Sequence, residues 1–164
     1  MNLLLWRHAE AEDGNGDGDS IPDLQRKLTR RGEQQARQMA QWINQHAPRS
    51  LRILASPAER TQQTVSALGR PYATDSRLAP GASVDDLLDA AGWYAEREDA
   101  KDAAVLIVGH QPTLGQAAAY LLCGYEASWS VKKGAVWWLS CRTRNDETQT
   151  LVQAVISCSL LKES

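Results

Sequence analysis

The sequence predicts an α/β protein: a three-layer sandwich with a mostly parallel central sheet and a C-terminal antiparallel hairpin at its edge. Short apolar runs alternate with segments of helical periodicity over the first three quarters of the chain, which is typical of a parallel sheet covered on both faces. Two further runs of strand-forming residues then close the chain around a polar turn. With 164 residues, 43% of them apolar and 23% charged, we expect one domain over residues 1–164.

The first half of the chain is expected to supply two strands and two helices. In order, these are a strand at Asn2–Trp6, a helix at Arg30–His46, a strand at Leu51–Ala55 and a helix at Ser56–Leu68. The first helix has apolar residues at helical spacing, and Thr29 stands where an N-cap is needed. The second has Pro57 in its first turn and Gly69 after its end, as helix boundaries commonly do.

The second half is expected to repeat this alternation and then to change character. In order, we expect a loop at Leu78–Ser83, a helix at Val84–Glu98, a strand at Ala103–Val108, a turn at Gly109–Thr113, a helix at Leu114–Cys123, and hairpin strands at Ala135–Cys141 and Thr148–Ile156 joined by Arg142–Glu147. The run Ala103–Val108 is continuously apolar, which is typical of a strand buried on both faces.

The segment Ala9–Gln25 is expected to be a solvated, mobile loop, because it holds six acidic residues, no basic residue and several glycines. Its Asp13-x-Asn15-x-Asp17-Gly18 copies the first half of a calcium-binding loop, but position twelve is Leu24 in place of the bidentate glutamate. We therefore expect no calcium site. The acids are expected to form a negative rim that steers a protein partner with basic residues.

Composition excludes several functional classes. The formal net charge of −2 offers no global field for nucleic acid or an anionic membrane. Three well-separated cysteines, Cys123, Cys141 and Cys158, suggest neither a zinc site nor a disulfide framework, and they are expected to be inert. No apolar run is long enough for a signal peptide or a membrane span. We expect a soluble, cytoplasmic protein.

Chemistry-bearing side chains follow three of the expected strands. Arg7 and His8 come directly after the first strand, His110 follows Ala103–Val108, and Arg60 lies about one turn into the helix after Leu51–Ala55. Ligands bind at the carboxyl ends of parallel strands, so these residues are expected to meet. Arginine forks bind phosphoryl oxygens, and a neutral imidazole can attack phosphorus. With no phosphate-binding glycine loop and no obvious magnesium-binding carboxylate cluster at these strand ends, the set favours phosphoryl transfer through a phosphoenzyme without a metal.

Five blocks of sequence stand out, in this order: LLWRHAEAE (Leu4–Glu12), RKLTRRGEQQA (Arg26–Ala36), SPAERTQQT (Ser56–Thr64), VLIVGHQPTLG (Val105–Gly115) and KKGAVWWL (Lys132–Leu139). Together they resemble the histidine phosphatase superfamily, which is also called phosphoglycerate mutase-like, and in particular its SixA-type phosphohistidine phosphatases. Agreement of five ordered blocks is far more specific than an Arg-His pair alone.

The resemblance implies that His8 is the phosphorylated nucleophile and that Arg7, Arg60 and His110 form the phosphate pocket around it. It also implies that Arg26 binds substrate, although Lys27 stands where the family usually has proline. No cofactor and no metal are implied. The implied substrate is phosphohistidine on a phosphotransfer-type signalling protein. Three alternatives remain: a phosphatase acting on small phosphomonoesters, a non-catalytic phosphohistidine-binding module, and a calcium-regulated binding module built around the acidic segment.

A missing carboxylate bears on the choice between phosphohistidine and phosphomonoesters as substrate. Superfamily members that act on phosphomonoesters usually carry a glutamate between Leu78 and Val84 that protonates the leaving oxygen, whereas this chain reads LAPGASV. Asp85 and Asp86 are the nearest replacements, but their place at the start of a helix favours solvent-facing charges. Losing a general acid forfeits ~10²–10⁴-fold in rate for an alkoxide leaving group and far less for imidazole. The sequence therefore favours phosphohistidine.

The remaining features have structural explanations. His46 is expected at the surface near a helix end, and Lys132 and Lys133 in a solvated loop. Trp6 and Trp42 are expected in the core. Trp137 and Trp138 alternate on a strand, so one is expected to pack in the core and the other to face outward.

Overall fold

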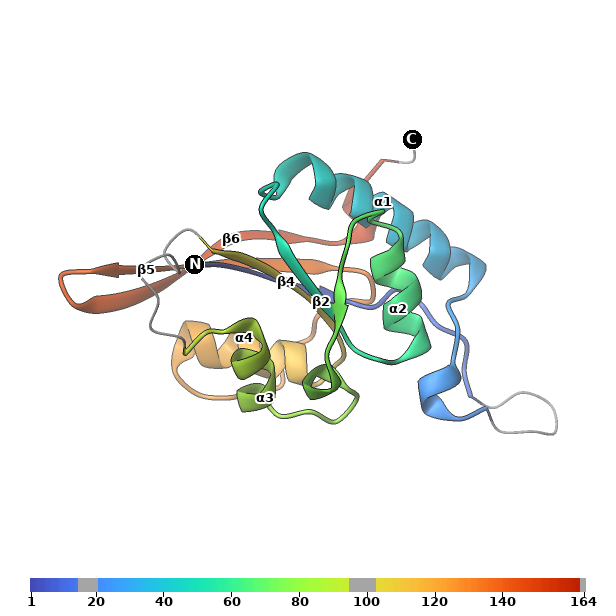
Figure 1. Cartoon of the computed structure of the whole chain (residues 1–164), viewed down its shortest axis with the longest axis horizontal. Coiled ribbons are helices and arrows are strands. Elements are labelled where there is room, and N and C mark those ends of the chain that lie inside the picture. Colours follow the sequence, from blue (N-terminus) through green and yellow to red (C-terminus); the bar gives the residue numbers. More distant parts are fainter. Residues whose placement is uncertain (15–20, 95–102, 163–164) are drawn as a thin grey trace.

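The computed structural model, which describes residues 1–14, 21–94 and 103–162, has one six-stranded sheet with strand order β3-β2-β4-β1-β5-β6 (Figure 1). The strands are β1 (Asn2–Arg7), β2 (Arg52–Ala55), β3 (Ala73–Thr74), β4 (Ala104–Gly109), β5 (Val136–Arg144) and β6 (Glu147–Ile156). β1 to β4 run parallel, while β5 pairs antiparallel with β1, and β6 with β5. The predicted parallel sheet with a C-terminal antiparallel hairpin is confirmed.

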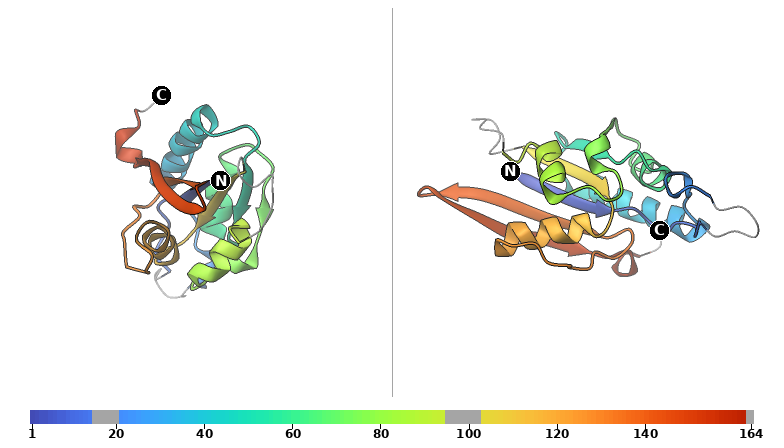
Figure 2. Two further views of the ribbon diagram at one scale, coloured as in Figure 1. Left: turned by 90° about the vertical axis from the view of Figure 1, so that its left-hand side faces the viewer. Right: turned by 90° about the horizontal axis from the view of Figure 1, so that it is seen from below.

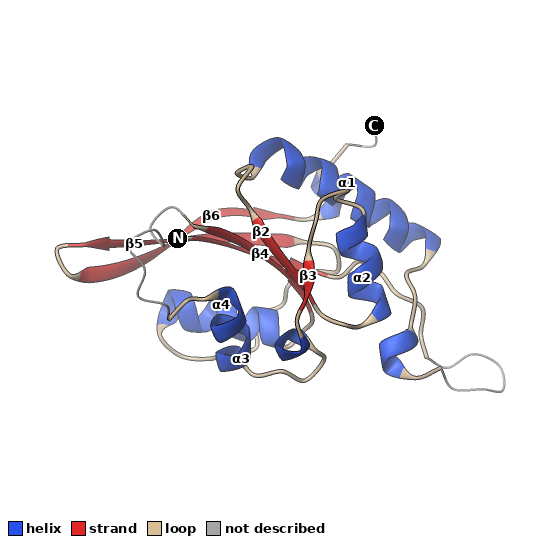
Figure 3. Ribbon diagram, viewed as in Figure 1, coloured by secondary structure: helices blue, strands red, loops and turns tan. Residues whose placement is uncertain are grey.

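Helices cover both faces of this sheet (Figures 2 and 3). α1 (Arg30–His46) and α2 (Glu59–Ser66) pack on one face, and α3 (Val84–Ala91) and α4 (Thr113–Cys123) on the other. Successive residues of β1 serve the two cores: Leu3 and Leu5 pack towards α3 and α4, and Leu4 and Trp6 towards α1 and α2. Because neither face of β1 or β4 meets water, these strands are continuously apolar instead of alternating.

Two glycines allow helices to approach neighbouring backbone closely. A Cβ on Gly32, in the first turn of α1, would lie 1.9 Å from the carbonyl oxygen of Glu10. A Cβ on Gly115 of α4 would lie 1.8 Å from the carbonyl oxygen of Trp129. No other residue fits at these distances. The glycines therefore hold the segments after β1 and before β5 against the helices.

α1 begins and ends where the sequence predicts, with the Thr29 side chain accepting a hydrogen bond from the Gly32 amide. α2 is shorter than predicted, beginning at Glu59 rather than Ser56. The Ser56 carbonyl accepts hydrogen bonds from the side chains of Thr61 and Gln62, which keeps the preceding residues out of the helix. Arg60 therefore lies in the first turn of α2, not one turn into it.

α3 also ends early, because Gly92 adopts a left-handed conformation with φ of 72° and terminates it. The last residues of the predicted helix, 95–98, lie outside the described part of the chain. The two-residue strand β3 was not predicted, since it has no apolar pattern. Among the helices of the described residues, none combines the length and hydrophobicity that a membrane-crossing segment requires.

The hairpin strands are longer than predicted. The turn consists of Asn145 and Asp146, both with positive φ (53° and 60°), as a tight hairpin turn requires. Arg142 and Glu147, which were assigned to the turn because they are polar, belong to β5 and β6. β6 forms the edge of the sheet, and β5 lies inside it.

The tryptophans correct one expectation. Trp137 and Trp138 do point to opposite faces, but both are half-buried, so the prediction that one faces outward was wrong. Trp137 packs near Trp129, with ring centroids 6.0 Å apart, and Trp138 meets Trp42 edge to face at 6.4 Å. Trp6 is fully buried, as predicted, whereas Trp42 is only partly buried.

Candidate active site

His8 and His110 meet at the carboxyl end of the sheet. β1 and β4 are neighbours with Arg7 opposite Gly109, so the residue after each strand end stands at the same level. The His8 amide donates to the Gly109 carbonyl at 3.1 Å, and the two imidazole centroids are 5.3 Å apart. Both rings are buried, at 7% and 4% exposure. The predicted meeting of these histidines is confirmed.

The His8 ring is oriented by the backbone of the next residue. Nδ1 lies 2.7 Å from the Ala9 carbonyl oxygen, which can only accept, so Nδ1 carries the proton and Nε2 carries the lone pair. The pKa of His8 is lowered to about 4: burial is the largest cause, the charges of Arg60, Arg7 and Arg26 act in the same direction, and the Ala9 hydrogen bond opposes them. His8 is therefore neutral near pH 7, with Nε2 able to act as a nucleophile.

His110 is fixed by Ser56, a contact that the sequence analysis missed. His110 Nε2 lies 2.7 Å from Ser56 Oγ, which also accepts from the Ala58 amide at 3.2 Å. The hydroxyl proton is then available for Nε2, which leaves the His110 proton on Nδ1. The pKa of His110 is lowered to about 3, and burial is the largest cause, followed by the charges of Arg60 and His8. The signal in the sequence was a small polar residue directly after a buried strand.

Arg7 and Arg60 are both held through Nη groups of their guanidinium. Arg7 Nη1 donates to the Val131 carbonyl at 2.8 Å. Arg60 donates from Nη1 and Nη2 to Asp23. Among the described residues, three buried side-chain nitrogens have no hydrogen-bond partner: Arg7 Nε, Arg60 Nε and His110 Nδ1. Buried donors without a hydrogen bond are rare, because each one costs about 1–3 kcal/mol of stability. The side chains that carry them lie near His8, since the charges of Arg7 and Arg60 act on its pKa and the His110 ring is next to it. A small tetrahedral oxyanion would satisfy such donors.

Asp23 is the second residue that the sequence analysis missed, since it was assigned to a solvated loop. It begins a short 3₁₀ turn (Asp23–Gln25), from which its carboxylate bridges two arginines. Oδ2 lies 3.1 Å from Arg60 Nη2, Oδ1 lies 2.9 Å from Arg26 Nη2, and the Asp23 carbonyl accepts from Arg60 Nη1 at 2.7 Å. Although burial raises the pKa of Asp23, the hydrogen bonds from Arg60 and Arg26 outweigh it and lower the pKa.

Arg26 therefore reaches the site through Asp23. Besides the carboxylate, it donates from Nη1 to the Glu12 carbonyl at 3.0 Å. Its charge still acts on both histidines, since it contributes to the lowered pKa of each. Arg26 thus lies in the outer part of the site and contacts the same carboxylate as Arg60.

Asp85 and Asp86 lie where the sequence predicts, in the exposed first turn of α3. Asp86 forms a capping box with Ser83, and Asp85 accepts from the Tyr94 hydroxyl at 3.3 Å. Within residues 1–14, 21–94 and 103–162, no three histidine, cysteine or acidic side chains gather closely enough to hold a metal ion.

The acidic segment Ala9–Gln25 is only partly described. Ala9 and Ala11 are buried, and Ala11 forms a bridge with Leu28, so the start of the segment is not a solvated loop. Asn15, Asp17 and Gly18 of the calcium-like motif lie outside the described residues, and so does the middle of the segment whose mobility was predicted. His46, as predicted, is exposed at the end of α1.

Comparison with known proteins matches residues 3–81 to the family model of the histidine phosphatase superfamily (branch 1). An uncharacterized protein of Picosynechococcus sp. is 34% identical over 129 residues, which cover 76% of this chain and 74% of the relative.

Solved structures share the fold. The protein histidine phosphatase SixA complexed with tungstate is 24% identical, with a TM-score of 0.78 over 99% of this chain and 100% of the other. The putative phosphohistidine phosphatase SixA of Nakamurella multipartitia is 26% identical, with a TM-score of 0.71 over 95% of both chains. A mycobacterial glucosyl-3-phosphoglycerate phosphatase in complex with inorganic phosphate is 19% identical, with a TM-score of 0.70 over 98% of this chain and 99% of the other.

These matches confirm the resemblance seen in the sequence, and the two histidines and the arginines of that resemblance lie together in the structure. The chain belongs to the histidine phosphatase superfamily and is an enzyme of the phosphatase class.

Proposed function

We propose that this enzyme hydrolyses phosphohistidine on a partner protein of the phosphotransfer type, through a phospho-His8 intermediate. The observation that carries the proposal is a buried, neutral His8, with its lone pair on Nε2, among three unpaired donors. Such a site combines a nucleophile with a binding site for the phosphoryl oxygens.

The first step transfers the phosphoryl group to His8. Nε2 attacks phosphorus, the bond from phosphorus to the partner's imidazole nitrogen breaks, and its electron pair returns to that nitrogen. In the second step water attacks the phosphorus of phospho-His8 and loses one proton to bulk solvent, the P–N bond breaks with its electrons returning to Nε2, and inorganic phosphate leaves. While Nε2 carries phosphorus the ring is cationic, and the Ala9 carbonyl on Nδ1–H stabilises that charge.

The surrounding residues have distinct roles in this proposal. Arg7, Arg60 and His110 donate from Nε, Nε and Nδ1 to the phosphoryl oxygens, where charge builds up in the transition state. Asp23 is a positioning residue: it holds the Nη1 and Nη2 groups of Arg60, so that the Nε edge remains for substrate. Arg26 supports the same carboxylate from its other side.

The chemistry of the leaving group supports phosphohistidine as substrate. The carboxylate of Asp23 contacts the phosphate-binding Arg60, but Arg60 and Arg26 keep it ionised, so it is a poor proton donor. Asp85 and Asp86 are committed to Tyr94 and Ser83. An alkoxide needs a proton in order to leave, whereas a phosphohistidine ring that is already protonated leaves as neutral imidazole.

One alternative draws on the comparisons, since a solved structure with this fold is a phosphatase of glucosyl-3-phosphoglycerate, a small phosphomonoester. The test compares kcat/KM on a phosphohistidine-bearing phosphotransfer protein, on free phosphohistidine and on a panel of sugar and serine phosphates. We expect phosphohistidine to be preferred by at least ~10²-fold, because the segment from Leu78 to Val84 has no carboxylate that could protonate an alkoxide. Comparable values on an alkyl phosphate would establish the alternative.

The intermediate is tested separately. Wild-type enzyme quenched during turnover is expected to carry an acid-labile, alkali-stable phosphoryl group, and His8→Ala is expected to lose both the label and turnover. Absence of any turnover in the wild type would favour the non-catalytic binding module. We place the reaction in the cytoplasm, in keeping with three cysteines that form no disulfide among the described residues.

A further inference from the structure

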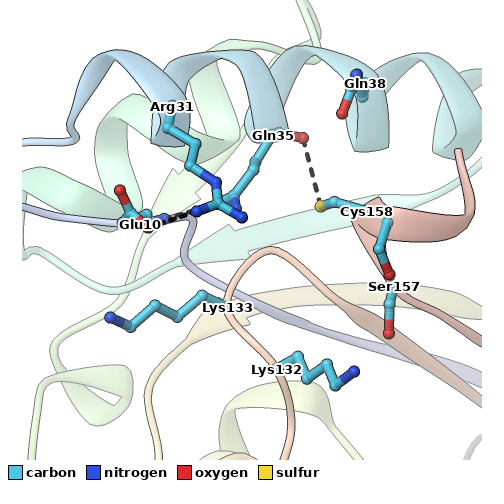
Figure 4. A pocket seen from close by; sticks show the side chains of 9 residues that line it. Glu10, Arg31, Gln35, Gln38, Lys132, Lys133, Ser157 and Cys158 are labelled. Atoms are coloured by element: carbon cyan, nitrogen blue, oxygen red, sulfur yellow. Dashed lines mark hydrogen bonds and ion pairs between the residues drawn. The ribbon is translucent and has the colours of Figure 1, made fainter. Parts of the chain in front are cut away.

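A groove of about 430 Å³ lies between α1 and the segment before β5 (Figure 4). One wall is the first half of α1, with Arg31 and Gln35, and the facing wall is the segment before β5, with Lys132 and Lys133. Glu10 lies at one end and Cys158 at the other. We call it the basic groove.

The basic groove is tied to the backbone that carries the nucleophile. Lys132 and Lys133 lie between Val131, whose carbonyl accepts from the Arg7 side chain, and Gly134, whose amide donates to the carbonyls of Arg7 and His8. At one end of the groove, Glu10 follows His8 by two residues, so their Cα atoms lie within about 7 Å of each other. One wall and one end of the groove are therefore joined within a few residues to the backbone around His8.

The groove has an excess of positive charge. Lys132 and Lys133 are exposed and make no ion pair within the described residues. Arg31 is 75% exposed and meets Glu10 only at 3.9 Å, while Glu10 also accepts from the Thr29 hydroxyl at 2.9 Å. Three cations therefore face one carboxylate, in a chain whose formal net charge is −2. This charge is not explained by internal pairing.

We propose that the basic groove binds an acidic segment that flanks the phosphohistidine in the partner protein. The inference rests on the proposed function and adds a determinant of partner choice to it. An extended segment fits better than a compact anion, because the cations stand on opposite walls on exposed, flexible side chains. Such charges select and steer a partner more than they add affinity.

The test uses three synthetic peptides with one central phosphohistidine. One has four glutamates before it, one has four glutamates after it, and the third has glutamine at all these positions. At low salt we expect wild-type enzyme to favour one acidic peptide over the glutamine peptide by about fivefold in kcat/KM, as suits two or three exposed ion pairs. Salt near physiological strength should reduce the preference, since the Debye length is then about 8 Å.

Lys132→Glu/Lys133→Glu should abolish or reverse this preference while hydrolysis of free phosphohistidine stays unchanged. The matched control is Arg37→Glu/Arg49→Glu, which changes the net charge equally at two exposed arginines outside the groove lining. We expect the control to keep the preference. Equal rates on all three peptides in the wild type, or an equal loss in both double variants, would overturn the proposal.

The proposal fails or stands independently of catalysis. Fluorescence anisotropy with the same three peptides, carrying a non-hydrolysable phosphohistidine analogue, measures groove binding directly. The acidic peptide that the wild type prefers in hydrolysis should bind the wild type and the control about fivefold more tightly than the glutamine peptide does. In the lysine double variant the two peptides should bind equally. Failure to hydrolyse free phosphohistidine would contradict the proposed function, and the anisotropy ratio would still decide for or against the groove.

Discussion

The neutrality of His8 can be tested through the pH dependence of stability, by comparing the wild type with His8→Gln. The folded-state pKa of His8 is lowered to about 4, while the unfolded chain titrates at the ordinary value of 6.5. Above 6.5 the ring is neutral in both states. As the pH falls, the unfolded state takes up a proton first, so the contribution of His8 to stability is present above 6.5 and lost as the pH falls through about 4.

The size of the effect follows from these two values. Between about pH 7.5 and about pH 5, the unfolded state gains a proton on His8 and the folded state gains almost none, which lowers the free energy of unfolding by about 2 kcal/mol. The pKa of His110 is lowered to about 3, so His110 lowers the free energy of unfolding by a similar amount, and it does so in the wild type and in His8→Gln alike. His8→Gln keeps a donor for the Ala9 carbonyl and removes the titrating group.

The assay is urea-induced unfolding of both proteins at the two pH values. The wild type is expected to lose about 2 kcal/mol more than His8→Gln on acidification, because every other titrating group is common to both. Carbon-13 spectra of the labelled ring should show His8 as the neutral imidazole, protonated on Nδ1 only, throughout this range. Equal losses in the two proteins would refute the neutral nucleophile, and with it the argument that burial and neighbouring arginines prepare His8 for attack.

Three further predictions concern contacts around the site. Arg60→Ala should lower kcat/KM on phosphohistidine by about one to two orders of magnitude, because it removes charge-assisted contacts of about 1.5–3 kcal/mol. Arg60→Lys should recover only part of this kcat/KM, because a point charge cannot hold both Asp23 and the phosphoryl group. Full recovery in Arg60→Lys would show that the forked shape of the guanidinium is unimportant. Asp23→Ala should lower kcat/KM about tenfold and weaken inhibition by inorganic phosphate, with a smaller loss in Asp23→Asn, which keeps an acceptor. Tighter phosphate binding would instead make Asp23 a competitor. Gly32→Ala should lower the free energy of unfolding in urea by about 1–3 kcal/mol, because the new methyl group displaces Glu10. Gly109→Ala is the control and should lower it less, because a Cβ there would lie 3.5 Å from its nearest atom. Equal losses in the two variants would contradict the close approach at Gly32.

Some of this protein was determined by the sequence alone. The bounds of α1 follow from helical spacing and the Thr29 cap, and the buried strands follow from continuous apolar runs, because these signals act over a few residues. The convergence of Arg7, His8, Arg60 and His110 was also predictable, since the topology of a parallel sheet brings strand ends to one edge.

The rest was decided by tertiary structure. Asp23 and Arg60 lie 37 residues apart, and nothing local in the acidic segment shows that its 3₁₀ turn returns to α2. The contact of Ser56 with His110 and the lowered pKa of both histidines likewise depend on how deeply separate elements bury one another. Trp137 and Trp138 alternate by sequence, but only helices on both faces leave both half-buried. Local patterns predict which elements form and which residues carry chemistry, whereas the charge state and orientation of those residues depend on desolvation and distant partners, which exist only in the folded chain.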